Sequence, residues 1–445
     1  APFFKTKLMK HLLRYLLWLC LSIEVANAQT NIQSVIAIFA EKPSVEWAPP
    51  IPNSPSMLVQ WQARTTSKEF RSFVGYYQDN FVATLSVGGQ SVSGSFHYRD
   101  KSYEISLQKG KLVFLPNKEF ECGTTDTPHS HPSPSTARPA ILAEETAPTI
   151  ANTQTLRVYR LAMHIPYSTF STGHLEKNVQ KVKTFWADTE AFLNEMYLRD
   201  LGVRFEVVND ERLIIKDATK ETFASSRNAS YVKDNSTIVI NNLIGENSYD
   251  VGISLVYTSS QKSGIRGLAY LEGVYQPNTK ADAVAVLTKE VIAHEIGHLF
   301  GGKHTFGSYK GSEAYDSEKT EYDRGTSVMS YGSPRDFFSL SSIERIRQRL
   351  TQVPAKAKDK TFATQAPRID RSKLKNHYTI PKGTFFQFYI PATDPDSEQL
   401  LYAVNQHDVR NGAETPITQY AIYKPTTANP VTIKTEYNDS GTAVA

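Results

Sequence analysis

Three histidines and a glutamate lie close together in the stretch 291–304, and residues of these types could hold and use a metal ion. His294 and His298 are about one helical turn apart, so on a helix both side chains project from the same face. Two neutral imidazoles placed in this way can bind one Zn²⁺, with Glu295 beside the open coordination position. The apolar residues around them fit a half-buried helix. The pattern therefore predicts a zinc-binding helix.

A third ligand, His304, follows a glycine pair that can end this helix. Gly301 and Gly302 allow positive φ, so the chain can turn sharply and bring His304 back to the metal. Three protein ligands leave the fourth position of zinc free for water, which distinguishes a catalytic site from a closed structural one. Surface histidines on an amphipathic helix are the alternative interpretation. The added glycine and third histidine at fixed spacing favour the zinc site.

These residues resemble the signature of the metzincin metalloproteases, in which the extended histidine motif is followed by a methionine turn. The segment 326–332, Thr-Ser-Val-Met-Ser-Tyr-Gly, is similar to that turn. The resemblance implies that Met329 forms a hydrophobic floor beneath the histidines. It also implies that Tyr331 is the swinging fifth ligand or transition-state donor of astacins and serralysins. The implied activity is zinc-dependent hydrolysis of peptide bonds in protein or peptide substrates, with Glu295 as the general base.

The resemblance implies a catalytic domain over residues 155–352 with an α+β (α/β) fold, a mixed sheet and the zinc helix. Alternating or continuous apolar residues predict strands at 157–165, 203–208, 237–240 and 251–257. Helical spacing of apolar residues predicts helices over 175–201 and 343–350. This order of strands and helices is typical of a mixed sheet with helices packed on it.

The segment Gly267, Leu268 and Ala269 lies just before the zinc helix. In reprolysin-like metzincins this position is the edge strand that pairs with an extended substrate backbone, and the small residues would permit close approach. An ordinary strand edge is the alternative. Thr305 follows the third histidine where adamalysins carry Asp and astacins carry Glu. A secreted bacterial enzyme of reprolysin-like type fits the motifs best.

Residues 9–28 have the pattern of a signal peptide, with a basic start, an apolar core and the small-residue cleavage signal Ala26-Asn27-Ala28. The expected location is therefore extracellular, either secreted or associated with the cell surface. A lipoprotein with Cys20 as the modified residue is the alternative. Leu19 argues against it, because the residue before a lipidated cysteine should be small.

The composition excludes several classes of partner. The net charge of +4 is small and dispersed over 445 residues, which argues against nucleic acid. Outside the N-terminal segment no apolar run is long enough for a membrane span. A monomer of about three domains is expected.

Residues 29–122 are predicted to form a β-rich propeptide, with alternating segments at 81–87, 92–98 and 102–107. Once the signal peptide is removed, Cys122 is the single cysteine. Its thiolate could fill the water position on zinc and keep an unprocessed enzyme latent, which is the cysteine switch of several metzincin propeptides. A small buried residue is the alternative role for Cys122. Residues 123–154, rich in Thr, Pro, Ser and Ala, are predicted to be a flexible linker that contains the activation cleavage.

Residues 367–445 resemble a truncated immunoglobulin-like or cadherin-like β-sandwich, with strands at 384–390 and 400–404. Asp394 and Asp396 between them could bind Ca²⁺, but a hydrogen-bonded turn is favoured. This segment and the secreted location support an alternative function, an extracellular binding or adhesion protein with a vestigial protease fold. The complete set of zinc ligands and Glu295 argues for the protease instead.

Overall fold

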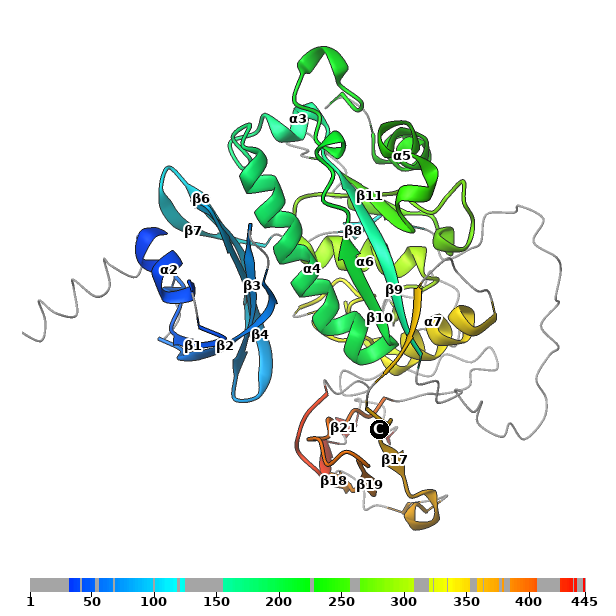
Figure 1. The fold of residues 1–445 in the computed structure, drawn as a ribbon. Helices are drawn as coiled ribbons and strands as arrows, with labels where there is room; N and C mark the ends of the chain where they lie inside the picture. Colours follow the sequence, from blue (N-terminus) through cyan, green and yellow to red (C-terminus); the bar gives the residue numbers. More distant parts are fainter. Residues whose placement is uncertain are drawn as a thin grey trace, which may run out of the picture. The chain divides into compact units, whose positions relative to one another are not determined.

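The computed structural model describes residues 32–124 and 155–352, apart from breaks at 41, 53–55, 67–68, 99–100, 118–120, 225–227, 257–264, 308–319, 323 and 334, together with separate stretches between 358 and 444. The predicted signal peptide at 9–28 and most of the predicted linker at 123–154 lie outside the described residues. The chain divides into two compact units (Figure 1). The first contains residues 1–97, 102–117 and 173–191, and the second contains 98–101, 118–172 and 192–445.

The first unit is an antiparallel sheet whose sequential strands are neighbours. Its strands are β1 (Ser44–Trp47), β2 (Val59–Thr66), β3 (Arg71–Tyr77), β4 (Asn80–Gly88), β5 (Ser91–Tyr98), β6 (Lys101–Gln108) and β7 (Lys111–Pro116). The preceding helix α2 (Ile32–Phe39) inserts Phe39 among Trp47, Trp61 and Phe73, with ring centroids 4.9–5.5 Å apart. Edge-to-face aromatic contacts of this kind supply a large part of a small core.

The opposite face of this sheet is polar but also buried. It consists of small residues such as Ser72, Thr84 and Ser86, and residues 173–191 pack on it within the same unit. The hydroxyl of Ser72 donates to the carbonyl of Ala187 (3.3 Å), and that of Ser93 donates to Asp188 (3.3 Å). The strands predicted at 81–87, 92–98 and 102–107 are therefore confirmed, but burial in β4 and β5 does not alternate because both faces are covered.

The second unit is built on a mixed sheet with the order β10-β9-β11-β13-β12-β8, and β16 also pairs with β9. The strands are β8 (Glu121–Cys122), β9 (Thr155–His164), β10 (Val203–Val207), β11 (Val251–Leu255), β12 (Ile265–Ala269), β13 (Ala283–Ala285) and β16 (Lys358–Thr361). Neighbours from β10 to β13 are parallel, β12 is antiparallel to β13, and β8 adds parallel to β12. In the order of the sheet, β12 therefore lies next to the terminal strand β8, which contains Cys122.

Helices accompany this sheet (Figure 1). They are α3 (Tyr167–Phe170), α4 (Val179–Leu201), of which residues 192–201 belong to this unit, α5 (Ala229–Ile244), α6 (Lys289–Leu299) and α7 (Leu340–Gln352), with 3₁₀ turns η1 (Glu211–Leu213), η2 (Ala218–Lys220), η3 (Glu246–Ser248) and η4 (Gly273–Tyr275). A further 3₁₀ turn, η5 (Arg371–Lys373), belongs to the C-terminal stretches. Helix α6 is buried along its whole length. The hydroxyl of Tyr197 on α4 donates to the carbonyl of Ala293 (2.6 Å), so α4 contacts α6 directly. The result is a mixed α/β fold compatible with a metalloprotease domain.

The strand predicted at residues 237–240 is wrong, because this segment lies inside helix α5. The side chain of Asn228 caps the helix by accepting from the backbone N–H of Tyr231 (2.9 Å). Val232, Ile240 and Ile244 then fall on one buried face at helical spacing. The β-branched run Thr-Ile-Val-Ile favours a strand locally, but packing of this face against the sheet overrides the preference.

The C-terminal stretches form short two-stranded pairs. These are β17 (Arg368–Ile369) with β19 (Ala392–Thr393), β18 (Phe385–Phe388) with β20 (Val431–Lys434), and β21 (Glu436–Tyr437) with β22 (Ala443–Val444). The predicted strand at 400–404 contains a single bridge, Tyr402 with Thr426. The carboxylate of Asp394 accepts from the backbone N–H groups of Asp396 (2.8 Å) and Glu398 (3.1 Å), as in a hydrogen-bonded turn. The β-sandwich stays a prediction.

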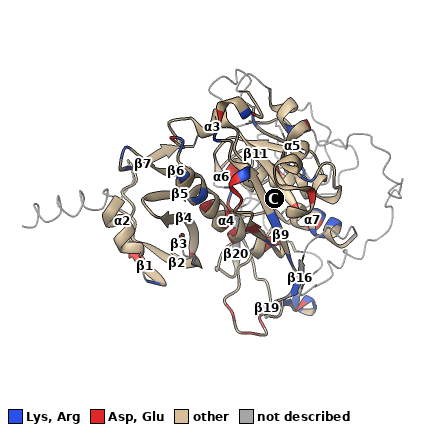
Figure 2. Ribbon diagram, turned by 45° about the horizontal axis from the view of Figure 1, so that its top comes forward, with Lys and Arg blue, Asp and Glu red and all other residues tan. Residues whose placement is uncertain are grey.

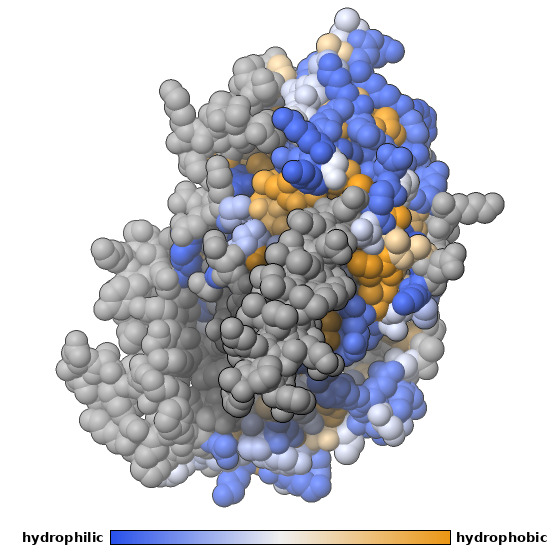
Figure 3. All heavy atoms as spheres, turned by 90° about the vertical axis from the view of Figure 1, so that its left-hand side faces the viewer, coloured by the Kyte–Doolittle hydropathy of each residue, from blue (hydrophilic) through white to orange (hydrophobic). Residues whose placement is uncertain are grey.

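The surface shows no single dominant character. Basic and acidic residues are interspersed over the elements of the described chain (Figure 2). On the face drawn in Figure 3 the described atoms are mostly hydrophilic, and apolar atoms gather in separate patches. Within the described part of the chain, no helix has both the length and the apolar character needed to cross a membrane.

Candidate metal centre

Helix α6 presents His294 and His298 on one face, as their spacing predicts. Their Nε2 atoms lie 3.0 Å apart. Each Nδ1 faces a backbone carbonyl, that of Val328 for His294 (2.7 Å) and that of Gly302 for His298 (2.7 Å). A carbonyl can only accept, so each Nδ1 carries the proton and each neutral ring presents an unprotonated Nε2. The two rings are oriented as metal ligands.

The chain returns His304 to the same point after the helix ends. Gly301 has φ +97°, the left-handed conformation that the sequence predicted for this turn. The ring of His304 stacks on that of His294 at a centroid distance of 5.3 Å and an angle of 30°. The backbone N–H of Thr305 donates to the carbonyl of Met329 (3.1 Å). The residue after His304 is thus tied to the segment predicted to be the methionine turn.

Cys122 joins these histidines from strand β8. Its Sγ lies 3.5 Å from Nε2 of His298 and 3.4 Å from Oε2 of Glu295. The ligand atoms of Cys122, His294, His298 and His304 all lie within 4.8 Å of one another, and all four side chains are buried. Three imidazole nitrogens and one thiolate are a normal donor set for tetrahedral Zn²⁺. Two unprotonated Nε2 atoms at 3.0 Å also repel each other unless a cation lies between them, so the residues present fit a zinc ion.

Burial controls the protonation of this cluster. It lowers the pKa of His294 well below the usual value, and the neighbouring His298 and His304 lower it further. It raises the pKa of Glu295 well above that of an exposed carboxyl group. Burial and then the nearby Glu295 carboxylate raise the pKa of Cys122. A divalent cation would reverse this last effect, because a coordinating thiol is deprotonated.

Gly267 on β12 makes room for Glu295. A Cβ atom at this position would lie 2.1 Å from Oε1 of Glu295, a distance that no packed structure accommodates. Among the described residues, this Oε1 has no hydrogen-bond partner although it is buried. The sequence predicted a small residue here for close approach of a substrate. The structure shows a different requirement, space for the glutamate.

Residues 122–124 lie along β12, the strand predicted to bind substrate. The N–H of Gly123 donates to the carbonyl of Gly267 (3.0 Å). The hydroxyl of Thr124 accepts from the N–H of Ala269 (2.9 Å) and donates to its carbonyl (3.2 Å). One side chain therefore satisfies both backbone groups of Ala269. The sequence carried no signal for this role of Thr124.

Met329 and Tyr331 both lie at the cluster. The sulfur of Met329 is packed under the zinc helix, since a Cβ added to Gly297 would lie 2.4 Å from it and one added to Gly302 would lie 3.2 Å away. The hydroxyl of Tyr331 lies 3.4 Å from Nε2 of His304 and donates to the carbonyl of Cys122 (2.9 Å). The structure thus brings together all the side chains that the sequence singled out here.

A buried ion pair near the site was not predicted. Arg335, in the segment after Tyr331, pairs with Glu290 in the first turn of α6, and both side chains are buried. The backbone N–H of Arg335 donates to the carbonyl of Thr326 (2.9 Å). Neither residue belongs to a periodic pattern or motif, so only the fold shows that this pair ties the segment around Met329 to the zinc helix.

Part of the chain matches a known protein family. Residues 179–352 match the family model of the reprolysin-like metallopeptidases of family M12B. No curated protein sequence matches the chain. Among solved structures, the chain is similar to metalloproteinase-II from Bacteroides fragilis, with a TM-score of 0.44 and 9% identity, over 72% of this chain and 96% of that chain.

Proposed function

We propose that the chain is a secreted zinc-dependent endopeptidase made as a latent zymogen, and the match of residues 179–352 to the reprolysin-like metallopeptidase family supports this proposal. One observation carries the proposal. Three imidazole nitrogens and the Cys122 sulfur converge within 4.8 Å, and Glu295 lies beside them. Three ligands from the catalytic segment and a fourth from an upstream segment are the arrangement expected of an enzyme whose last coordination position is blocked.

His294, His298 and His304 would hold the zinc ion. The carbonyls of Val328 and Gly302 keep the first two rings in the tautomer that binds metal. Zinc, when bound, supplies a Lewis acid that polarises the scissile carbonyl and acidifies a water molecule. The protein supplies the orientation of the ligands and a buried site.

Glu295 is the proposed general base. It accepts the proton of the attacking water and passes it to the leaving amine. Gly267 leaves the space in which this carboxylate sits. Tyr331 donates to the developing oxyanion, a role supported by its hydrogen bond to a backbone carbonyl at the same place, that of Cys122.

Latency has two parts in this proposal. Cys122 would take the coordination position that water needs, and residues 123–124 use the hydrogen-bonding groups of Gly267 and Ala269. An extended peptide substrate would bind these same backbone groups by adding to the edge of the sheet. Cleavage within 123–154 and departure of residues 122–124 would free the water position on zinc and the backbone groups of β12.

The alternative is an extracellular binding or adhesion protein with a vestigial protease fold. It is supported by the predicted C-terminal β-sandwich and the predicted signal peptide. The complete ligand set and the retained Glu295 weigh against it, because a site that no longer turns over is free to lose them.

The test compares the full-length chain carrying Cys122→Ala with the same chain carrying Glu295→Ala as well. We expect about one zinc per chain in both proteins. Only the Cys122→Ala protein should cleave casein, and a chelator should block that cleavage. If the Cys122→Ala protein binds zinc but cleaves no casein even after proteolysis within 123–154, the binding protein is supported instead. Cleavage that survives Glu295→Ala would remove this residue from the mechanism.

A further inference from the structure

Glu321, on β15 (Glu321–Tyr322), is a buried carboxylate that belongs to none of the motifs above. Its Oε1 accepts from the backbone N–H groups of Thr326 (2.7 Å) and Ser327 (2.9 Å). Its Oε2 accepts from the hydroxyls of Ser327 (2.5 Å) and Thr305. Burying a carboxylate is costly unless charge-assisted hydrogen bonds replace water, and here both oxygens have such partners.

One of these partners, Thr305, directly follows the proposed zinc ligand His304. His304 comes after helix α6 ends and after the turn at Gly301, so the helix does not fix its position. Thr305 does so instead, through hydrogen bonds of its backbone and of its hydroxyl. Its N–H donates to Met329, its carbonyl accepts from the N–H of Glu321 (2.8 Å), and its hydroxyl donates to the Glu321 carboxylate. The Thr305 hydroxyl also lies 3.2 Å from that of Ser327. Two of these bonds, one from the backbone and one from the side chain, therefore lead to Glu321.

The other two partners of Glu321 lie next to Val328, whose carbonyl orients a second proposed ligand, His294. Thr326 and Ser327 directly precede Val328, whose carbonyl accepts from Nδ1 of His294. The loop is also wrapped tightly around the carboxylate. Gly325 has φ +63°, and a Cβ there would lie 2.9 Å from the Cδ of Glu321. One side chain thus bridges the segment after His304 and the segment that orients His294.

We propose that Glu321 is a positioning residue that sets the geometry of the zinc site by holding these two segments in register. The inference rests on the proposed zinc site and adds to it a residue that touches neither metal nor substrate. Removing one of its acceptor oxygens should loosen His304 and the carbonyl behind His294 together. The consequence is faster loss of zinc, and not simply lower stability.

The test measures how fast full-length protein loaded with zinc releases the metal to an excess of a colorimetric chelator. The variants are Glu321→Gln and Thr305→Val, the second of which keeps the side-chain shape and removes only the hydroxyl contact. We expect about 10-fold faster release for Glu321→Gln, the usual scale for residues that orient metal ligands, and a smaller acceleration for Thr305→Val.

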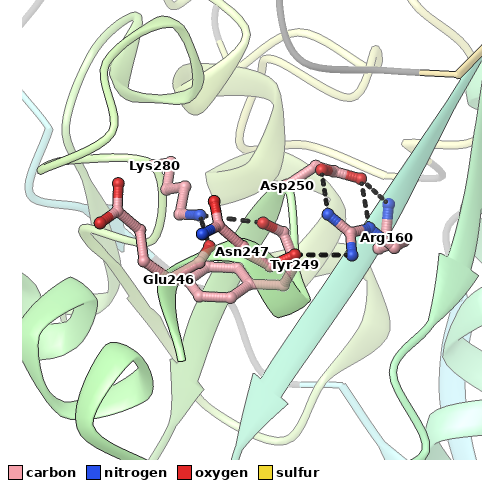
Figure 4. Close-up of polar contacts among 6 residues, drawn as sticks. All are labelled: Arg160, Glu246, Asn247, Tyr249, Asp250 and Lys280. Atoms are coloured by element: carbon pink, nitrogen blue, oxygen red, sulfur yellow. Dashed lines mark hydrogen bonds and ion pairs between the residues drawn. The ribbon is translucent and has the colours of Figure 1, made fainter. Parts of the chain in front are cut away.

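Asp250→Asn is the matched control. Asp250 is also a carboxylate in a dense hydrogen-bond cluster of the second unit, but its partner is Arg160, with bonds of 2.8–3.0 Å to the backbone N–H and the guanidinium (Figure 4). The urea midpoint of the metal-free proteins reports stability separately. Asp250→Asn should lower this midpoint and leave zinc release within about 2-fold of wild type, since its partners do not adjoin the ligands.

The outcomes separate this inference from the proposed function. If wild type binds one zinc and both Glu321→Gln and Thr305→Val release it at the wild-type rate, Glu321 is only structural and the inference fails while the zinc site stands. The inference also fails if Asp250→Asn accelerates release as much as Glu321→Gln does. A wild-type chain that binds no zinc would overturn both proposals.

Discussion

The hydroxyl of Tyr331 donates a 2.9 Å hydrogen bond to the backbone carbonyl of Cys122. The side chain proposed to stabilise the oxyanion is therefore already engaged with a peptide carbonyl of the blocking segment. In the proposed zymogen this hydroxyl would hold Cys122, and after the proposed activation it would be available to a substrate.

Tyr331→Phe tests the second of these roles. In a chain that also carries Cys122→Ala, loss of this donor should lower kcat by about 100-fold, the scale found when one oxyanion donor is removed. Zinc content should not change, because the phenol is not one of the three permanent ligands. Steady-state cleavage of a quenched peptide measures the effect. An unchanged kcat would exclude Tyr331 from transition-state stabilisation.

Thr124→Val tests whether latency depends on β12 as well as on zinc. Valine keeps the shape of the side chain but leaves the N–H and carbonyl of Ala269 without the partners that Thr124 supplies. Two lost hydrogen bonds of about 1 kcal/mol each should raise the basal activity of the uncleaved chain by about 30-fold. The assay is peptide cleavage by protein shown to be intact by gel. Basal activity equal to that of wild type would mean that Cys122 alone maintains latency.

Gly267→Ala should strongly reduce activity without removing the zinc ligands. The new Cβ would lie 2.1 Å from Oε1 of Glu295, so the carboxylate must leave its position. In the Cys122→Ala background we expect kcat/KM to fall by about 100-fold or more, the contribution typical of a positioned general base. Gly173→Ala is the control, since a Cβ there meets nothing within 4 Å. Full activity in Gly267→Ala would show that Glu295 can act from elsewhere.

His164 should make the fold sensitive to acid. Its ring is buried between the hydroxyls of Ser254 (3.0 Å) and Thr222 (3.1 Å), and burial lowers its pKa from 6.5 to about 3. The unfolded chain therefore binds a proton below pH 6.5 that the folded chain refuses until about pH 3. The free energy of unfolding should fall across this window, by up to about 1.4 kcal/mol per pH unit.

The measurement for His164 is urea unfolding of wild type and His164→Gln between about pH 7 and pH 4, inside the window in which only the unfolded chain is protonated. The zinc ligands titrate equally in both proteins, so the difference between the two isolates His164. The variant should lose stability less steeply as the pH falls. Parallel pH dependences would contradict the assignment.

Local spacing was sufficient to predict the metal-binding helix. The one-turn separation of His294 and His298 and the glycine pair before His304 act within a few residues, where backbone geometry alone sets which side chains meet. Apolar periodicity likewise predicted β9, α4 and α7. It failed at residues 237–240, where β-branched residues favour a strand and packing of α5 imposes a helix.

The tertiary structure decided what closes and supports the site. Cys122 and His298 are 176 positions apart, and Thr124 and Ala269 are 145 apart, so no periodic pattern could pair them. The sequence suggested Cys122 through its uniqueness, but it contained no sign of Thr124 or Glu321. Hydrogen bonds of this kind depend on where the sheet and loops bring distant backbone groups together. That placement is a property of the folded chain, while the histidine spacing is a property of a single helix.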